Sequence, residues 1–446
     1  MFAGCVAPGG LFGVKSGVRF GVLSDLHVTD WASAEVFRKA LAYFRGRDVD
    51  AVMITGDLTD HGLLPQLENV AKSWYEVFPY DRGPGGKTVE KLFVTGNHDI
   101  SGLGYRDATM EASFKAMNLT YEQAGRLTLA RQGVAKCWEQ CFYEPYLPIY
   151  SKRIKGFDFI GGHWDQPDGI RGLEAAWEAN VAKVDTGRPF FYFQHGAPRA
   201  TVFGDDSWGH DLGQSTLCLR DFPNAVAFSG HSHLPLTDGR CVWRGGFTSI
   251  SASSLSYVCM PDGEKRRNAP DYRTNLDCRH GMVVDAYDDR LVIERRDFVH
   301  DEPLGDDLVF AMPTRGSTFE VRAFSREELP AFPRKAGVSA AVEGDALVVR
   351  FLGAFENPTA RPYEYRVSVE YVLADGGKGS LKSRWFQADA CFSRTRAAKA
   401  ENVVTVPLAE LPEGAVQARV RLTPMNCYGG AGKDTVSDSV RFKSRI

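Results

Sequence analysis

The sequence lacks several features that would each point to a particular class of protein. No apolar run approaches the roughly 20 residues that a membrane-spanning helix needs. The formal net charge of the 446 residues is only −3, so no basic excess points to nucleic acid as a bulk partner. With 43% hydrophobic and 24% charged residues the composition is that of an ordinary soluble globular protein, and the length favours two domains.

The spacing of the nine cysteines does not match the pattern of a metal-binding site. Cys137 and Cys141 are the only close pair; they lie four residues apart in a stretch with helical character, where both would share one face. Because no second pair completes a zinc site, buried or incidental thiols are favoured. Disulfides stay open as an alternative, since they require export and the sequence does not decide the compartment.

Residues 1–17 read as a flexible N-terminal segment with two interpretations. Phe2–Cys5 resembles the last part of a bacterial lipoprotein signal, in which the cysteine is lipidated after cleavage. The charged region and the apolar core that should precede it are missing. If the sequence shown begins late, we expect a periplasmic or cell-surface protein with a lipid anchor at Cys5. If the segment is an ordinary terminus, a cytoplasmic location follows.

The chemistry of the chain is concentrated in short loops that follow apolar strands. The expected strands are residues 18–23, 51–55, 91–95, 188–194 and 225–228. The loops after them are Ser24–His27, Gly56–Gly62, Gly96–Asp99, Gln194–Pro198 and Ser229–His233. Amphipathic helices are expected at 32–45 and 63–78, between the first three strands, which is βαβ order. In such sheets ligands collect at the carboxyl ends of the strands.

Histidine is distributed unevenly along the chain. Besides His61, five of the ten histidines lie in these loops, at positions 27, 98, 195, 231 and 233, and all ten precede residue 301. Histidines with ordinary structural roles would be scattered over the core and the surface. Such a distribution easily explains a histidine in one of these loops, but poorly explains histidines in all five. The pattern therefore favours a shared metal or catalytic centre.

These blocks resemble the calcineurin-like metallophosphoesterase superfamily over roughly residues 18–300. The matching motifs, in chain order, are Asp25-x-His27, Gly56-Asp57, Gly96-Asn97-His98-Asp99, His195 and Gly230-His231-x-His233. Within the superfamily the domain looks most like the class III cyclic-nucleotide phosphodiesterases. The five-block pattern is specific, whereas a single block would not be. The resemblance implies an α/β fold, a four-layer α/β/β/α sandwich.

The resemblance also implies a cofactor of two divalent metal ions, Mn, Fe or Zn. Asp25, His27 and His233 would hold the first ion. Asn97, His195 and His231 would hold the second, and Asp57 would bridge the two. Carboxylate and imidazole ligands without cysteine suit these metals. Such a pair generates a bridging hydroxide for in-line attack on phosphorus and stabilises the developing charge.

Other residues receive roles in catalysis or substrate binding. By resemblance, His98 contacts the phosphate and assists the leaving oxygen, and Asp99 orients the His98 ring and keeps it cationic; the alternative is that Asp99 only caps the next segment. His61, His163 and Arg199 lie on loops near the expected site and are candidate substrate contacts. For each, an ordinary structural role is the alternative.

Departures from related subclasses leave the substrate less well specified than the metal chemistry. Asp60 stands where purple acid phosphatases have a tyrosine, and His61 where protein phosphatases have an arginine. The block around His195 matches class III phosphodiesterases only in part. Residues 100–155 read as a polar helical insertion, either a lid or a covering loop.

The composition changes after His300. Residues 301–316 contain two prolines and two glycines and read as a linker. Residues 317–446 are expected to form an all-β immunoglobulin- or fibronectin-III-like sandwich. Its expected strands are 318–324, 347–351, 363–373, 402–406, 415–422 and 437–442, with a hairpin turn at Asp375-Gly376.

Together these patterns predict a metal-dependent hydrolase of a phosphodiester substrate. A phosphomonoesterase with the same site is the close alternative. A cell-surface binding protein that acts through the C-terminal sandwich is the alternative from another class. Against it, every expected metal ligand is present, whereas a vestigial site would be expected to have lost at least one. The sequence leaves the oligomeric state open.

Overall fold

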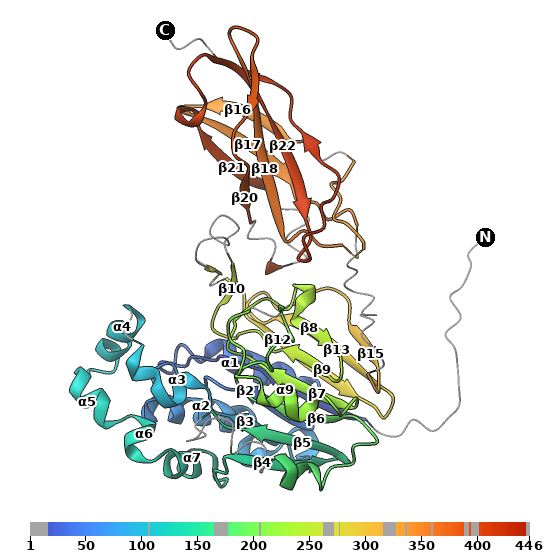
Figure 1. The fold of residues 1–446 in the computed structure, drawn as a ribbon. Coiled ribbons are helices and arrows are strands. Elements are labelled where there is room, and N and C mark those ends of the chain that lie inside the picture. Colours follow the sequence, from blue (N-terminus) through green and yellow to red (C-terminus); the bar gives the residue numbers. More distant parts are fainter. Residues whose placement is uncertain are drawn as a thin grey trace.

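The fold is drawn in Figure 1 from a computed structural model. The structure describes residues 17–105, 108–164, 177–204, 207–261, 272–275, 277–314, 327–334, 337–357, 360–387, 392–393 and 401–442. The lipoprotein-like segment and the expected strand 318–324 lie outside these ranges. Within them, no helix is both long enough and apolar enough to cross a membrane.

The first sheet contains the three strands expected at the start of the chain. β1 (Val18–Leu23), β2 (Ala51–Thr55) and β3 (Glu90–Val94) are parallel neighbours. Helices α1 (Glu35–Gly46) and α2 (Leu64–Val77) connect them, which confirms the βαβ prediction. The antiparallel hairpin of β12 (His280–Ala286) and β13 (Arg290–Asp297) joins the sheet beside β1.

The second sheet has the order β4-β5-β6-β7-β9-β8. Its parallel strands are β5 (Phe157–Gly162), β6 (Phe190–Phe193), β7 (Ala225–Ser229) and β9 (Thr248–Ser251), and β8 (Val242–Arg244) closes one edge. β4 (Ile149–Ile154) pairs antiparallel with β5 at the other edge. Residues 149–154 were expected inside the helical insertion, and that part of the prediction is wrong.

An apolar core between the two sheets holds the layers together. The fully buried ring of Phe20, on β1, contacts Phe159 and Phe191 of the second sheet with centroid distances of 5.3 and 4.9 Å. A second core lies between the first sheet and helices α1 and α2. A third packs α9 (Gln214–Leu219) on the second sheet. The domain is therefore the expected α/β/β/α sandwich.

The insertion after β3 is largely helical and forms the lobe at the left of Figure 1. Its helices are α3 (Asn97–Ser101), α4 (Ala108–Ala116), α5 (Tyr121–Arg126), α6 (Leu129–Gln132) and α7 (Val134–Phe142). Cys137 and Cys141 are buried on α7, and all seven cysteines within the described residues are free thiols. The structure therefore agrees with the prediction that Cys137 and Cys141 are buried thiols.

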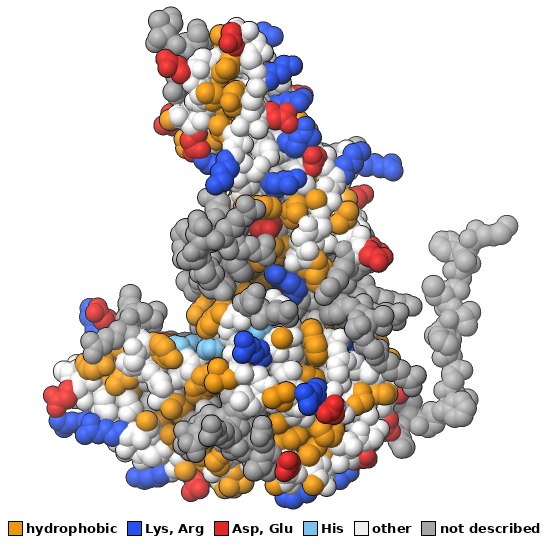
Figure 2. Space-filling model, viewed as in Figure 1, with side chains coloured by type: hydrophobic (Ala, Val, Ile, Leu, Met, Phe, Trp, Pro, Cys, Tyr) orange, Lys and Arg blue, Asp and Glu red, His pale blue; other side chains and the backbone are white. Residues whose placement is uncertain are grey.

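The C-terminal region is a β-sandwich. One sheet contains β16 (Ser339–Glu343), β17 (Ala346–Leu352) and β21 (Glu401–Pro407). The other is built on the long pair β18 (Glu364–Leu373) and β22 (Ala415–Met425), flanked by β19 (Lys378–Ser380), β20 (Arg384–Phe386), β23 (Thr435–Val436) and β24 (Val440–Arg441). Figure 2 shows Lys and Arg side chains interspersed with Asp and Glu on the visible face of this domain.

The predicted linker 301–316 is wrong in the part that the structure describes. β14 (Glu302–Pro303) and β15 (Leu308–Ala311) both pair with β13 and extend the first sheet. Leu308 and Phe310 alternate with exposed residues and bury their side chains in the core between the sheets. Gly305, with a φ of 97°, lies between these two strands, and Pro303 belongs to β14 itself.

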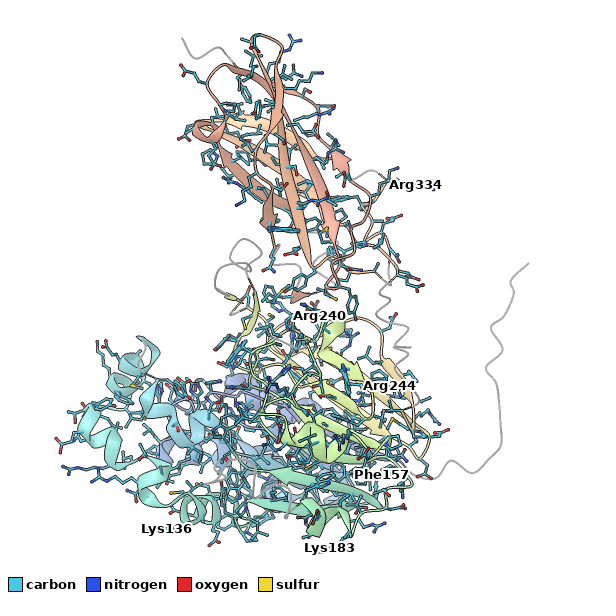
Figure 3. All side chains as sticks on the ribbon, in the orientation of Figure 1. Lys136, Phe157, Lys183, Arg240, Arg244 and Arg334 are labelled. Atoms are coloured by element: carbon cyan, nitrogen blue, oxygen red, sulfur yellow. The ribbon has the colours of Figure 1, made fainter. Side chains whose placement is uncertain are left out.

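Side chains of the first domain take part in the core of the sandwich. The hairpin of β10 (Val258–Pro261) and β11 (Tyr272–Asn275) rises toward the sandwich, and Val258 and Met260 join its buried core. Beside this hairpin, Arg240 marks the junction in Figure 3. Its guanidinium donates to Asp238 and lies 4.9 Å from the ring centroid of Tyr363. The sandwich is thus packed directly against a segment of the first domain.

Candidate metal centre

The seven predicted metal ligands come together at one edge of the two sheets. They lie in the loops after β1, β2, β3, β6 and β7, at the carboxyl ends of parallel strands. In Figure 2, histidine side chains are visible between the helical lobe and the rest of the first domain. The loops meet there because the two sheets pack with these strand ends side by side.

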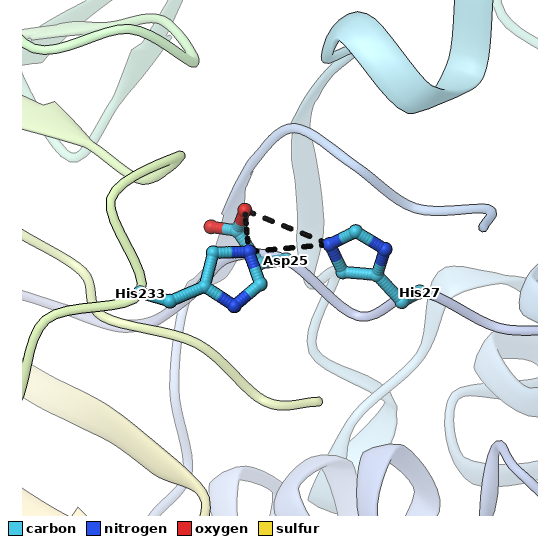
Figure 4. Close-up of side chains that lie close together, drawn as sticks. All are labelled: Asp25, His27 and His233. Atoms are coloured by element: carbon cyan, nitrogen blue, oxygen red, sulfur yellow. Dashed lines mark hydrogen bonds and ion pairs between the residues drawn. The ribbon is translucent and has the colours of Figure 1, made fainter. Parts of the chain in front are cut away.

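The first group of candidate ligands is Asp25, His27 and His233, drawn in Figure 4. The Oδ1 atom of Asp25 lies 3.0 Å from His233 Nε2 and 3.9 Å from His27 Nε2. The two Nε2 atoms are 3.3 Å apart. All three side chains are buried.

Asp57 connects this group to a second one. Its Oδ2 atom lies 3.6 Å from His27 Nε2 and 3.1 Å from His195 Nε2. Asn97 Oδ1 lies 3.0 Å from His195 Nε2, and His231 completes the group with Asp57 and His195. Asp57 therefore faces both groups, as a bridging ligand must.

Hydrogen bonds at Nδ1 fix which nitrogen of three histidines faces the centre. The Nδ1–H groups of His27, His195 and His233 donate to Asp60 Oδ1, Thr55 O and Tyr257 O at 2.8, 2.9 and 3.1 Å. These oxygens only accept, so each neutral ring carries its hydrogen on Nδ1 and a lone pair on Nε2. Such outer hydrogen bonds are what orients histidine toward a metal.

The converging atoms are therefore all electron-pair donors. Three Nε2 lone pairs meet two carboxylate oxygens and an amide oxygen at 3.0–3.9 Å. Asp25 Oδ1 is buried and accepts no hydrogen bond of adequate geometry. Buried acceptors facing one another are unfavourable unless a cation lies among them. The donor set fits divalent metal ions, and its carboxylate–imidazole composition fits Mn, Fe or Zn.

Without metal, protons partly replace the cations. Burial disfavours the charged form of His195, but the charges of Asp57 and Asp25 outweigh it and raise its pKa to about 9. The pKa of His27 is raised well above its usual value because bonds to Asp25 and Asp60 overcome the same cost of burial. Burial also disfavours ionised Asp57, yet the neighbouring histidines hold the pKa of this carboxyl below its ordinary value. The carboxylates thus stay ionised and attract positive charge.

Backbone strain is concentrated at these residues. Asp25, His27, Asp57, His231 and His233 all have positive φ, between 45° and 67°. Non-glycine residues adopt this left-handed region uncommonly, and strain of this kind clusters at functional sites. Five strained residues in one centre indicate that the fold maintains the ligand geometry at a cost in stability.

Comparison with known proteins supports this geometry. Residues 18–235 match the family model of the calcineurin-like phosphoesterases. Residues 18–235 form a calcineurin-like phosphoesterase domain. A search of curated protein sequences finds no significant match.

A search of solved structures finds similar chains at low identity. A predicted phosphoesterase from Streptococcus pneumoniae TIGR4 is 13% identical, with 66% of this chain and 98% of that chain covered and a TM-score of 0.27. GAP50 of Plasmodium, described as the anchor in the inner membrane complex, is 13% identical, with coverages of 68% and 91% and a TM-score of 0.37. Vacuolar Protein Sorting 29 from Cryptosporidium parvum is 11% identical, with coverages of 67% and 100% and a TM-score of 0.29.

The contacts of Asp99 favour the alternative in which this residue caps the segment after β3. Its carboxylate accepts hydrogen bonds from the backbone N–H groups of Gly96 and Thr59 at 2.8 Å, and also from Leu58 N. It therefore ties the loop after β3 to the loop after β2. His98 is oriented by Asp60 instead, because its Nδ1–H donates to the Asp60 carbonyl oxygen at 2.7 Å.

The three candidate substrate contacts have hydrogen bonds or ring contacts of their own. His61 is buried, with its ring against Phe114 and its Nε2 3.2 Å from Asp60 Oδ2. His163 is buried and accepts a hydrogen bond from Thr95 N; burial lowers its pKa to about 3. Arg199 is exposed, and its backbone N–H donates to Asp211 at 3.1 Å. The structure thus favours the ordinary structural alternative for His61 and His163.

Two supporting residues were not predicted from the sequence. Asp60 hydrogen-bonds the His27 ring through its side chain and the His98 ring through its carbonyl group. Tyr257 stacks on His233 at a centroid distance of 4.1 Å and accepts its Nδ1–H. Asp60 lies in the same short loop as Asp57, so its position in the sequence could have identified it as a supporting residue. Tyr257 follows β9 and carries no motif, so only the fold reveals it.

Proposed function

We propose that this protein is a dinuclear metal-dependent phosphodiesterase. The observation that carries the proposal is the convergence of two groups of buried donor atoms that share Asp57. The family supports hydrolysis of a phosphoric ester. The preference for a diester rests on the charge of the site.

The seven residues would hold two metal ions. Asp25, His27 and His233 would hold one, and Asn97, His195 and His231 the other, with Asp57 between them. When bound, two divalent ions supply Lewis acidity for the phosphoryl oxygens and a water nucleophile at neutral pH. The chain supplies the fixed positions: the Nδ1 hydrogen bonds keep each Nε2 lone pair aimed inward.

His98 is the group proposed to assist the leaving oxygen. Burial lowers its pKa, so the ring is neutral in the free protein, with its hydrogen on Nδ1 bound to the Asp60 carbonyl oxygen. Its Nε2 is then the atom that takes up and returns a proton. An anionic phosphate beside the ring would favour the protonated form. His98 N also donates to Asp57 Oδ1 at 2.8 Å, which links it to the centre.

The polar groups at the centre favour a diester over a monoester. A phosphomonoester carries about −1.5 to −2 charges near pH 7, whereas a diester carries a single one. The described side chains that meet at the centre are imidazole, carboxylate, amide and aromatic groups. Arg199, one of the candidate substrate contacts, is exposed, and its backbone N–H donates to Asp211. Binding a diester therefore requires less positive charge from the protein and its metal ions than binding a monoester does.

The reaction class is tested with bis-p-nitrophenyl phosphate beside p-nitrophenyl phosphate. The protein is stripped of metal and supplied with Mn, Fe(II) or Zn. We expect faster release of p-nitrophenolate from the diester, and only with metal present. Faster cleavage of the monoester would support the phosphomonoesterase alternative. Hydrolysis of neither ester, with no metal bound, would contradict the hydrolase and leave the C-terminal sandwich as the functional part.

Metal binding is expected to strengthen as the pH rises. His195 has a pKa raised to about 9, and the pKa of His27 is also raised, so both rings hold protons that they must lose to bind metal. Each displaced proton changes the apparent affinity about tenfold per pH unit. Titration calorimetry with Mn²⁺ at pH 6, 7 and 8 should give an affinity that increases by at least about 100-fold over this range for one proton. An affinity independent of pH would show that these rings are not ligands.

A further inference from the structure

Three of the exposed aromatic side chains lie directly on histidines of the candidate centre. Tyr105, Trp164 and Trp208 are 45%, 41% and 44% exposed. The Tyr105 ring stacks on His98 at a centroid distance of 4.6 Å and an angle of 22°. Trp164 and Trp208 contact the His231 ring at 5.5 and 4.7 Å. Large aromatic rings left on the surface beside a site commonly mark a binding surface.

A packing role alone does not account for this exposure. His163 offers a comparison within the same domain, because it too is surrounded by aromatic rings. Its partner Trp138, at 4.9 Å, is only 4% exposed. The other two rings on His163, those of Tyr146 and Tyr150, are half-buried, whereas the rings on His98 and His231 are exposed.

The three rings come from different elements and border the centre at two positions. Tyr105 follows α3 and its hydroxyl accepts a hydrogen bond from Asn97 Nδ2 at 3.2 Å, next to His98. Trp164 follows β5 and Trp208 precedes α9, and both contact His231. A phosphate held among the seven ligands would have aromatic surface on the His98 side and on the His231 side.

The chemistry of these surfaces specifies the organic part of the substrate. Aromatic side chains bind planar rings by offset stacking or edge-to-face contact and tolerate different rings, because every one has a π-face. They add affinity without adding charge, which suits an ester that carries a single negative charge. An aliphatic ester arm would gain less from the same surfaces.

We propose that Tyr105, Trp164 and Trp208 bind the ester arms of the substrate, and that the substrate carries a planar ring, either an aryl group or a nucleobase. This inference rests on the proposed phosphodiesterase function and names its substrate class. The rings act in binding, so they set KM and the choice of ester, whereas the seven ligands and His98 set the chemistry.

The test uses three phosphodiesters with the same p-nitrophenolate leaving group and a different second arm: methyl, phenyl or 5′-thymidyl. We expect the wild-type protein with Mn²⁺ to show a kcat/KM about tenfold higher for a planar arm than for methyl, the size expected of one stacking contact. The phenyl and thymidyl arms distinguish an aryl group from a nucleobase. Equal kcat/KM for the methyl ester and both planar esters would overturn the inference.

Variants separate substrate binding from support of the histidines. Trp164→Ala and Trp208→Ala should each raise KM for the planar esters about tenfold, and by less for the methyl ester, which has only the p-nitrophenyl ring to stack. Trp164→Phe and Trp208→Phe, which keep a ring, should retain most of the preference. Tyr143→Ala removes an 80% exposed ring, directly after α7, that contacts Tyr75, and it should change nothing. An equal loss for methyl and planar esters would mean that the tryptophans do not bind the second arm of the ester.

A binding measurement keeps this inference separate from the proposed function. Tryptophan fluorescence is titrated with diphenyl phosphate and with dimethyl phosphate on the metal-loaded protein. Tighter binding of diphenyl phosphate, lost in Trp164→Ala and Trp208→Ala, supports the aromatic surface even if no ester is hydrolysed. Equal binding of the two diesters would overturn it even if hydrolysis is observed.

Discussion

Asp57→Asn should abolish metal-dependent hydrolysis of bis-p-nitrophenyl phosphate, with a loss of at least about 1,000-fold in kcat, or ~4 kcal/mol of transition-state stabilisation. Asp57 Oδ2 is the atom that faces both groups of ligands, 3.6 Å from His27 Nε2 and 3.1 Å from His195 Nε2. An amide has nearly the same shape but no charge. Two like-charged ions would therefore lose their shared anion while the fold is kept.

The measurement combines activity with metal content per chain. We expect the Asp57→Asn protein to bind at most one ion where the wild type binds two. Asp158→Asn is the matched control, because Asp158 is a buried carboxylate on β5 that accepts a hydrogen bond from Asp185 N at 3.0 Å, outside the centre. It should keep both ions and full activity. Wild-type activity in Asp57→Asn would refute the bridging role.

Gly230→Ala should damage the centre without touching a ligand side chain. A Cβ at position 230 would lie 1.8 Å from Ser24 Oγ and 2.3 Å from Asp25 Oδ2. Asp25 cannot move freely, because its Oδ2 accepts the His231 N–H at 2.9 Å and its Oδ1 faces His233 Nε2. Overpacking of this kind costs about 1–3 kcal/mol. We expect a lower melting temperature, weaker metal binding and at least about a tenfold loss of kcat, as a displaced ligand implies.

Gly46→Ala is the control for this substitution. Gly46 is exposed at the end of α1, and nothing lies within 4 Å of a Cβ built there. The change should be neutral or slightly stabilising, within about 1 kcal/mol, because alanine favours the helix. If Gly230→Ala binds metal and melts like Gly46→Ala, then Asp25 is not confined as the structure indicates.

The parts of the fold that were predictable from sequence are those with local signals. β1, β2 and β3 are short apolar runs, and each is followed within two residues by a loop that contains Asp, Asn or His. Such runs fix strand positions, and the βαβ order then fixes which strand ends meet. The convergence of Asp25, Asp57 and His195 follows from that order, even though they are far apart in sequence.

The parts that were missed depend on contacts that local patterns do not contain. β15 is a four-residue strand among prolines and glycines, and its place in the first sheet is set by burial of Leu308 and Phe310 in a core built from other segments. Asp99 stands beside His98 in sequence, but on a helical turn adjacent side chains point in different directions. Asp60, from another loop, therefore reaches the His98 ring instead.

The junction of the two domains shows the same limitation. Val258 and Met260 come from the phosphoesterase half yet are buried in the core of the sandwich. In the same segment, Cys259 N donates to the His233 carbonyl oxygen at 2.9 Å, and Tyr257 accepts the His233 Nδ1–H. The segment from Tyr257 to Met260 thus connects His233, a candidate ligand, to the second domain. Composition marked a boundary near residue 300, but side-chain packing joins the domains at residue 258.

The most direct measurement of the metal centre is an anomalous difference map from crystals grown with Mn²⁺. Two peaks are predicted in the first domain. One should be bordered by Asp25, His27 and His233, the other by Asn97, His195 and His231, with the Asp57 carboxylate between them. A map with no peak at these residues, from crystals of protein that hydrolyses bis-p-nitrophenyl phosphate, would contradict a dinuclear centre built from these seven side chains.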